Sequence, residues 1–366
     1  MRVAIDATPL TLPSGGIARY AYELTAALAA EFPADEYLLL SDQRWENGPT
    51  APNIQKGGLP RNCITRRWWL AGLPWELRRR RADVFHGTDF AVPYLPLTPS
   101  VLTLHDLSPW KQGELRAVGA GRIRRRTPHL LRIATMIVTP TEAIRREAIE
   151  HFHLSPARVA AVPLAASRQF QPRSEEETSG LLRRLAIARP YLLFVGTHER
   201  RKNLARLIEA WREARRECPD LRLVLAGRPG DNFSLPEVLN VAGEPGLIFT
   251  GRLADADIAG LMSQAALFVY PSLYEGFGLP VLEAMQAGAP VMISQDPALR
   301  EVSGDAAVSV DAGSAVSLAC AIVQLMRDPR ERMELRARGR RRAAQFCWRY
   351  SAIRTHEIYA EALQRF

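Results

Sequence analysis

Two glutamates eight positions apart flank a glycine-containing loop in the second half of the chain. Glu275 precedes Gly276 and Gly278, and Glu283 lies in the helical pattern that starts at Pro280. Proline in a first helical turn loses no hydrogen bond, so free N–H groups and the positive helix end can meet an anion there. One carboxylate can reach sugar hydroxyls and the other ribose hydroxyls. The pattern suits a nucleotide sugar, although a plain turn with an acid in the first helical turn also fits it.

Two cations follow a strand-like segment earlier in the same half. Arg201 and Lys202 come after YLLFVG, at the mouth of the next helical pattern, where they can meet a diphosphate leaving group. Fixed cations stabilise the charge that develops as a glycosidic bond breaks, without a metal, and such electrostatic stabilisation is usually the largest catalytic contribution. A solvated basic helix start is the alternative, and it conflicts with the preference for acids at that helix end.

The stretch EGFGLPVLEAMQAGAPV resembles the Glu-x7-Glu signature of retaining glycosyltransferases of family four, the group-one glycosyl transferases. The resemblance implies the α/β GT-B fold, in which two Rossmann-like domains face each other across a deep cleft. It places Glu275 beside the donor sugar and Glu283 on the ribose. The donor-binding residues that it implies are Gly15, Gly16, Arg201, Lys202, Arg252, Leu253, Glu275, Gly276, Phe277, Gly278, Leu279 and Glu283.

The donor base and sugar are inferred from a second part of the same resemblance. The run GTHERRKN is similar to the form common among mannosyl- and rhamnosyl-type members, so GDP-mannose is the first expectation, followed by UDP- or dTDP-sugars. Other members carry an arginine where this chain has Thr197, which puts one phosphate contact in doubt. Backbone groups from Gly251 to Leu253, after a strand, are expected to read a nucleobase edge, although a plain turn explains the glycine almost as well.

The N-terminal half offers weaker signals. Gly15 and Gly16 follow the strand-like RVAID and can bring N–H groups against a phosphate, as the family's Gly-Gly loop does. They lack the Gly-x-Gly-x-x-Gly of a dinucleotide site, which counts against a dehydrogenase. The run VLTLHDLSPW resembles the family's strand-end His-Asp, which implies that His105 contacts the donor sugar and joins Glu275, Arg201 and Lys202 as catalytic. His86 and Glu142 also match family positions, with structural roles equally open.

Strand-like runs alternate with helical patterns twice along the chain, which predicts two α/β units with parallel sheets and crossover helices. Ligands of such sheets bind at the carboxyl ends of the strands. The predicted organisation is an acceptor-binding domain over 1–170, a linker over 171–188, a nucleotide-sugar-binding domain over 189–345, and a C-terminal helix over 346–366 that packs back on the first domain.

Bulk composition agrees with two cores and a reducing compartment. The 366 residues are 47% hydrophobic and 24% charged, and the four cysteines show no paired spacing, so neither a disulfide framework nor a zinc site is encoded. MRVAID carries no signal-peptide pattern, and no apolar run reaches the roughly 18 residues of a membrane span. A cytoplasmic protein is therefore expected.

The formal charge of +9 is concentrated in the first half, where residues 1–170 hold 22 Lys/Arg against 15 Asp/Glu. A cluster of N-terminal arginines, Arg122, Arg124, Arg125 and Arg126, could attract an anionic bilayer and hold the protein at the inner face of the membrane. A solvated helical face explains the cluster equally well. Nucleic acid is disfavoured because no recognition module accompanies the arginines.

The implied reaction is transfer of a hexose with retention, to a glycan or polyprenyl-linked acceptor in surface polysaccharide assembly. No metal and no cofactor beyond the nucleotide-sugar co-substrate is expected. Because no carboxylate is placed as a nucleophile, a front-face displacement assisted by the leaving phosphate is the favoured mechanism. A sugar-nucleotide epimerase of the same fold and a non-catalytic module that binds sugar nucleotides or membranes remain as alternatives.

Overall fold

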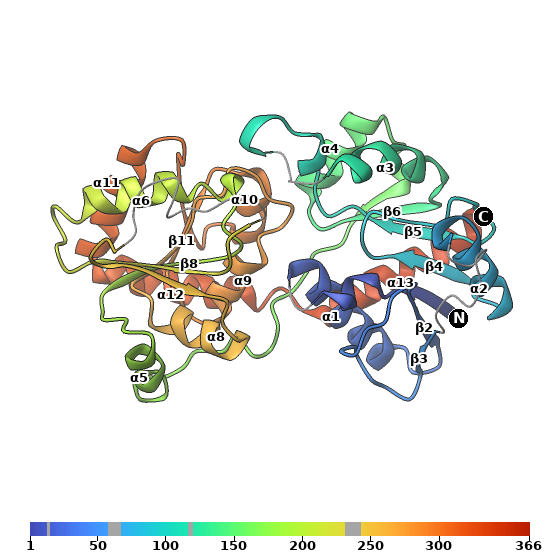
Figure 1. The fold of residues 1–366 in the computed structure, drawn as a ribbon, viewed down its shortest axis with the longest axis horizontal. Helices are drawn as coiled ribbons and strands as arrows, with labels where there is room; N and C mark the ends of the chain where they lie inside the picture. Colours follow the sequence, from blue (N-terminus) through green and yellow to red (C-terminus); the bar gives the residue numbers. More distant parts are fainter. Residues whose placement is uncertain (13–14, 58–66, 116–119, 231–242) are drawn as a thin grey trace. The chain divides into compact units, whose positions relative to one another are not determined.

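The chain folds into two compact units, which a computed structural model describes over residues 1–12, 15–57, 67–115, 120–230 and 243–366. Unit 1 comprises Met1–Trp110, Gly119–Leu164 and Cys347–Phe366, and unit 2 comprises Lys111–Val118 and Ala165–Phe346. Figure 1 shows a sheet flanked by helices in each unit. The prediction of two parallel-sheet α/β units is confirmed.

Within its described residues, unit 1 contains a seven-stranded parallel sheet in the order β3-β2-β1-β4-β5-β6-β7. Its strands are β1 (Arg2–Asp6), β2 (Glu36–Leu40), β3 (Ile54–Lys56), β4 (Val84–Gly87), β5 (Ser100–Thr103), β6 (Met136–Thr139) and β7 (Val159–Ala161). Its α-helices are α1 (Gly16–Glu31), α2 (Leu73–Arg79), α3 (Gly121–Ile133), α4 (Glu142–Phe152) and α13 (Trp348–Arg365).

The described part of unit 2 contains a six-stranded parallel sheet in the order β10-β9-β8-β11-β12-β13. Its strands are β8 (Tyr191–Val195), β9 (Arg222–Ala226), β10 (Leu247–Gly251), β11 (Leu267–Tyr270), β12 (Val291–Ser294) and β13 (Val308–Val310). Its α-helices are α5 (Glu175–Arg184), α6 (Leu204–Ala214), α8 (Asp255–Gln264), α9 (Leu279–Gln286), α10 (Pro297–Ser303), α11 (Ala315–Arg327) and α12 (Pro329–Ala343).

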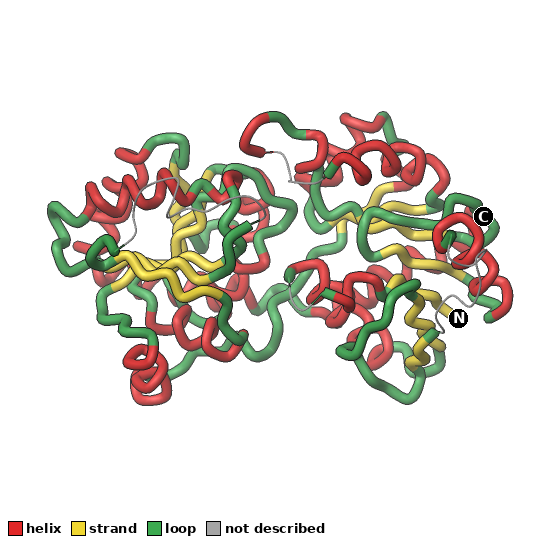
Figure 2. Tube along the Cα trace, viewed as in Figure 1, coloured by secondary structure: helices red, strands yellow, loops and turns green. Residues whose placement is uncertain are grey.

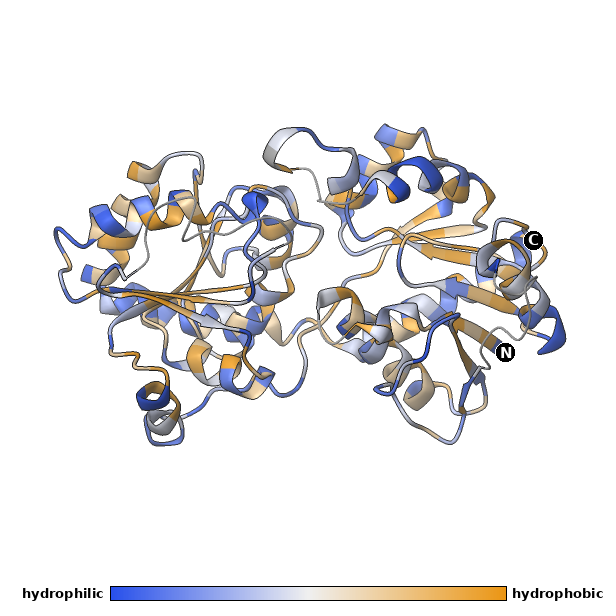
Figure 3. Cartoon of the chain, in the orientation of Figure 1, coloured by the Kyte–Doolittle hydropathy of each residue, from blue (hydrophilic) through white to orange (hydrophobic). Residues whose placement is uncertain are grey.

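Both cores are built around the central strands. Helices cover both faces of a parallel sheet, so these strands read as continuous apolar runs rather than alternating ones. Every residue of β8 and β11 is buried, for example. Figure 2 shows the helices around each sheet, and Figure 3 shows the strands as apolar segments beside helices of mixed hydropathy. The loops at the carboxyl ends of these strands carry most of the predicted site residues.

The predicted linker over 171–188 is not a simple connection, because it contains α5 and belongs to unit 2. A capping box starts this helix: the Oγ of Ser174 accepts from the N–H of Glu177, and the Glu177 carboxylate accepts from the N–H of Ser174. Only Thr178 and Leu182 of α5 are buried. The helix therefore lacks the wide apolar stripe that sequence patterns detect.

The C-terminal helix α13 belongs to unit 1, although all of 165–346 intervenes in the chain. Arg349 pairs with Glu31 at 2.8 Å, and the ring of His356 donates to or accepts from Asp35 at 2.8 Å. Inside the unit, the hydroxyl of Tyr359 contacts Nδ1 of the buried His86 at 2.7 Å. Among the helices that the structure describes, none is long and apolar enough to span a membrane.

Candidate functional site

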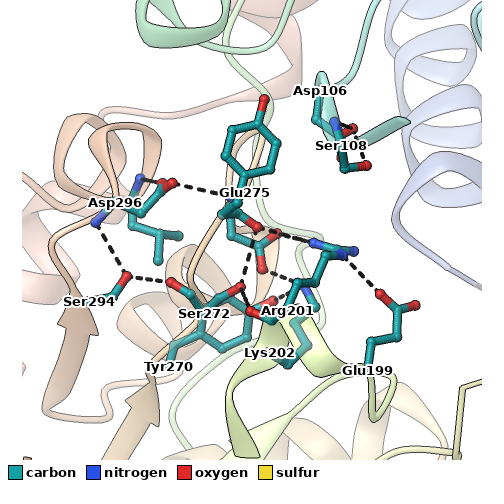
Figure 4. A network of polar contacts seen from close by, with 12 residues as sticks. Asp106, Ser108, Glu199, Arg201, Lys202, Tyr270, Ser272, Glu275, Ser294 and Asp296 are labelled. Carbon is teal, nitrogen blue, oxygen red and sulfur yellow. Dashed lines mark hydrogen bonds and ion pairs between the residues drawn. The ribbon is translucent and has the colours of Figure 1, made fainter. Parts of the chain in front are cut away.

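Glu275 lies in a buried cluster of charged groups at the carboxyl ends of β8 and β11 (Figure 4). Its carboxylate pairs with the ammonium of Lys202 and, at 3.4 Å, with the guanidinium of Arg201. Lys202 also donates to the hydroxyl of Tyr270 at 3.0 Å, and Arg201 pairs with Glu199 at 2.8 Å. The structure thus brings together three residues that the sequence predicted from motifs more than 70 positions apart.

Backbone contacts fix the two loops to each other. The turn Arg200–Lys202 follows β8, and the loop after β11 is hydrogen-bonded to it: the N–H of Leu273 donates to the carbonyl of Arg201 at 2.8 Å. The hydroxyl of Ser272 donates to the same carbonyl at 3.2 Å. Because β8 and β11 are neighbours in the sheet, their loops emerge side by side. The charged side chains are therefore held by the sheet rather than by their own attraction.

The charges control the protonation of the cluster. Burial opposes ionisation of Glu275, but the charges of Lys202 and Arg201 outweigh burial and lower the pKa of this carboxyl to about 2. Burial and the charge of Arg201 lower the pKa of Lys202, and Glu275 opposes that shift. Glu275 is therefore anionic at neutral pH, so it can accept hydroxyl hydrogen bonds but cannot serve as a proton donor.

Asp296 is part of this site and was missed by the sequence analysis. Its carboxylate accepts from the N–H of Glu275 at 3.3 Å and from the N–H of Leu299 at 3.0 Å, so it joins the signature loop to the start of α10. Burial raises the pKa of Asp296 to about 6. An acid directly after the apolar run VMIS was the available signal, because carboxyl strand ends collect site residues in this fold.

The remaining signature residues form the loop and first turn of α9. Gly276, Phe277, Gly278 and Leu279 are buried, and Gly278 adopts φ +88 as the residue before the helix. A Cβ at Gly278 would lie 2.3 Å from a side-chain carbon of Leu299, so only glycine fits here. Glu283 is 3% exposed within α9. The loop that follows β11 is thus closely packed, as a preorganised binding loop must be.

The segment predicted to read a nucleobase follows β10. Gly251 adopts φ +65 and its carbonyl accepts from the N–H of Gly227 at 2.9 Å. Arg252 is exposed and Leu253 is half-buried. The turn therefore lies at the same sheet edge as the Glu275 cluster. Base recognition by these backbone groups stays a prediction.

In unit 1, the predicted residues follow β1 and β5. Gly15, at φ +131, and Gly16 start α1 and are exposed. The half-buried His105 donates from Nε2 to the carbonyl of Thr88 at 2.7 Å, and its ring packs edge-on against Tyr20. The roles of these residues toward a donor sugar stay predictions.

His86 and Glu142 have structural contacts. The ring of His86 is bonded on both sides, to Tyr359 and at 2.8 Å to the hydroxyl of Thr103, and burial together with His105 lowers its pKa to about 3. It is therefore a neutral core histidine. Glu142 begins α4 and pairs with Arg145 at 3.0 Å.

Two searches of the described ranges concern metals and thiols. No group of three or more His, Cys, Asp or Glu residues that could hold a metal ion was found among the residues the structure describes. The cysteines in the described ranges, Cys218, Cys320 and Cys347, are free thiols, and Cys63 lies outside the described residues.

Comparisons with known proteins agree with this architecture. Residues 184–342 match the family described as Glycosyl transferases group 1, and residues 14–169 match Glycosyltransferase Family 4. O-antigen chain mannosyltransferase B of Escherichia coli is 31% identical over 98% of this chain and 99% of its own length. Two solved structures share the fold. Sucrose-phosphate synthase from Thermosynechococcus elongatus has a TM-score of 0.75 at 20% identity, over 99% of this chain and 98% of its own. Anabaena Alr3699/HepE in complex with UDP and glucose has a TM-score of 0.74 at 17% identity, over 97% and 98%.

Two parallel-sheet units, with anion-binding groups at the carboxyl strand ends of the second, define the GT-B class of nucleotide-sugar transferases. The chain belongs to the group 1 glycosyl transferases of glycosyltransferase family 4. A nucleotide sugar is accordingly its donor and a glycan its acceptor.

Proposed function

We propose that this glycosyltransferase transfers mannose from GDP-mannose to a glycan or lipid-linked acceptor in surface polysaccharide assembly, with retention of anomeric configuration and without a metal. The observation that carries the chemistry is the buried cluster of Glu275 with Lys202 and Arg201 beside the start of α9. Mannose is supported by the full-length likeness to an O-antigen chain mannosyltransferase and by the run GTHERRKN.

The proposed reaction uses the two cations to hold the departing diphosphate. The bond between the anomeric carbon and the phosphate oxygen breaks, and its electron pair stays on the phosphate, where Arg201, Lys202 and the first N–H groups of α9 stabilise it. The acceptor oxygen bonds to the same face of that carbon, and its proton passes to the departing phosphate. Glu275, anionic in its buried site, orients the sugar hydroxyls, and Glu283 accepts from the ribose. Fixed cations fill the part that a metal plays elsewhere.

GDP should stabilise the protein more than UDP or dTDP at equal concentration. A ligand that binds only the folded state at 100 times its dissociation constant adds about 2.7 kcal/mol, which thermal unfolding detects readily. Guanosine, which lacks the diphosphate, is the control and should shift the transition far less. A larger shift with UDP, the nucleotide bound by Alr3699/HepE, would overturn the choice of base.

The same preparation tests the reaction. GDP-mannose with a panel of glycosides should give a new α-mannoside, whose configuration is measured by NMR. A β-mannoside would contradict retention. An isomerised sugar nucleotide without acceptor would indicate an epimerase, and nucleotide binding without turnover on any acceptor would indicate a binding module.

The arginines of α3 are proposed to hold the enzyme on an anionic bilayer that presents a lipid-linked acceptor. Arg122, Arg124 and Arg125 are exposed on this helix. Each such charge contributes about 1 kcal/mol near an anionic surface, and the attraction weakens as salt screens it. Replacing these three by glutamate should reduce co-sedimentation with anionic vesicles and turnover on a lipid acceptor, but not hydrolysis of the sugar nucleotide in solution. Sedimentation that is insensitive to the charge reversal and to salt would identify a merely solvated face.

A further inference from the structure

Two charged side chains of unit 1 carry buried atoms that have no hydrogen-bond partner in the described part of the chain. They are Oδ1 of Asp89 and Nε of Arg126. The charge of Arg126 acts on Asp89, so the two side chains lie near each other without a bond between these atoms. A buried unpaired polar atom costs about 1–3 kcal/mol, and native structures contain few. An acceptor and a donor left unpaired in one place indicate a ligand that supplies both kinds of group.

The backbone around Asp89 is fixed tightly. Thr88, after β4, donates from its hydroxyl to the carbonyl of Asp6 at 2.8 Å. On the other side, Phe90 adopts φ 53 and its N–H donates to the carbonyl of Thr103 at 3.1 Å. A left-handed conformation at such a bulky residue costs about 1–3 kcal/mol and persists where the surroundings impose it. A Cβ at Gly87 would lie 1.6 Å from the carbonyl oxygen of Ala91, so the turn also requires glycine. Asp89 is therefore held in position by β1, β4 and β5.

His105 adds a third group with a defined protonation pattern. Its Nε2 contacts the carbonyl of Thr88 at 2.7 Å, and a carbonyl only accepts, so the proton of the neutral ring lies on Nε2. Nδ1 is then left with a lone pair that can accept a hydrogen bond. Burial raises the pKa of Asp89, while the charges of His105 and Arg126 oppose that shift. The three side chains thus share one electrostatic environment at the carboxyl ends of β4 and β5.

The chemistry of these groups selects a neutral hydroxyl-bearing ligand. A hydroxyl donates one hydrogen bond and accepts others, so it can satisfy the carboxylate or imidazole lone pair and the guanidinium together. An anion would meet the carboxylates of Asp89 and Asp106, which already influence each other, and a cation would meet Arg126. Asp89 and Arg126 are each half-buried as whole residues, so solvent reaches part of the site. A sugar ring meets all these requirements.

We propose that Asp89, together with Arg126 and His105, binds hydroxyls of the acceptor sugar. The assignment rests on the proposed transferase function. The acceptor is favoured over the donor because the groups suited to the nucleotide and its diphosphate, Lys202, Arg201 and Glu283, all belong to unit 2. Asp89 is then a substrate-binding residue that orients the nucleophilic sugar.

The experiment measures binding and kinetics separately. Binding of a panel of methyl glycosides, including methyl α-D-mannopyranoside, is followed by saturation-transfer NMR on the unaltered protein, Asp89→Asn and Arg126→Gln. Loss of a charge-assisted hydrogen bond should weaken binding of the recognised glycoside, and raise the KM for the acceptor, by roughly 10-fold or more. The KM for GDP-mannose and its slow hydrolysis without acceptor should stay unchanged.

Matched controls come from the same unit. Asp83→Asn alters a carboxylate at the opposite end of β4, where it accepts from the N–H of Arg2, and Arg146→Gln alters an exposed arginine of α4. Both should bind the glycoside normally. Unchanged glycoside binding in Asp89→Asn, or binding of no glycoside by the unaltered protein, would overturn the assignment. A raised KM for the donor would assign the residues to the donor sugar instead, whereas failure of the proposed function would appear as absent turnover with glycoside binding intact.

Discussion

Replacing Lys202 by alanine should lower turnover by about 10²-fold or more, the loss typical when one preorganised charge-stabilising group is removed. Lys202 is 6% exposed and its ammonium is fixed by Glu275 and Tyr270, so it needs no reorganisation as charge develops on the phosphate. Single-turnover measurement of mannosyl transfer isolates the chemical step. The same assay in EDTA should show full activity, because Arg201 and Lys202 supply the charge. Activity that depends on Mg²⁺ or Mn²⁺ would refute this account.

A loss of folding must be separated from a loss of catalysis in that variant. Without Lys202, the buried Glu275 keeps only the 3.4 Å contact with Arg201, and breaking a buried ion pair can cost about 3–5 kcal/mol. The double variant Lys202→Ala with Glu275→Gln removes the uncompensated charge, so it should recover thermal stability without recovering turnover. Arg206→Ala, an exposed cation of α6 that pairs with Glu209, is the matched control and should be near normal in both. Recovery of turnover in the double variant would show that Lys202 acts only on stability.

Glu275 and Glu283 should separate when each is replaced by alanine. Glu283→Ala should weaken GDP binding by roughly 10-fold or more, because a charged acceptor of the ribose hydroxyls is lost. Glu275→Ala should leave GDP affinity unchanged or raise it, since it frees Lys202 and Arg201 for the diphosphate, yet it should lower turnover strongly. Calorimetry with GDP and initial-rate kinetics test both statements. Equal losses of GDP affinity in the two variants would contradict the division of roles.

The central strands could be predicted from sequence, and three short strands could not. β3, β7 and β13 have three residues each and lie at sheet edges. An edge strand is partly exposed, as Gln55 and Lys56 of β3 are, so it lacks the apolar run by which buried parallel strands are recognised. Pairing with the neighbouring strand creates these elements, and pairing is not visible in a local pattern.

The site was predictable where a motif names the residue and not where contacts define it. Glu275, Lys202 and Arg201 lie in motifs, and the structure brings them together. Asp296 and Asp89 lie in no motif that the sequence reading used. Their importance comes from a hydrogen bond to another loop and from a buried atom without a partner, and both depend on the folded backbone.

The return of α13 to unit 1 determines the order in which the protein can be finished during synthesis. Domains usually fold as units, beginning with the one that leaves the ribosome first. Here the helix that packs against α1, β4 and β5 is translated last, after the whole of unit 2. Until then His86 lacks the hydroxyl of Tyr359, and the apolar surface beneath the helix is uncovered. Unit 2 can therefore reach its native state earlier than unit 1, although most of unit 1 is made first.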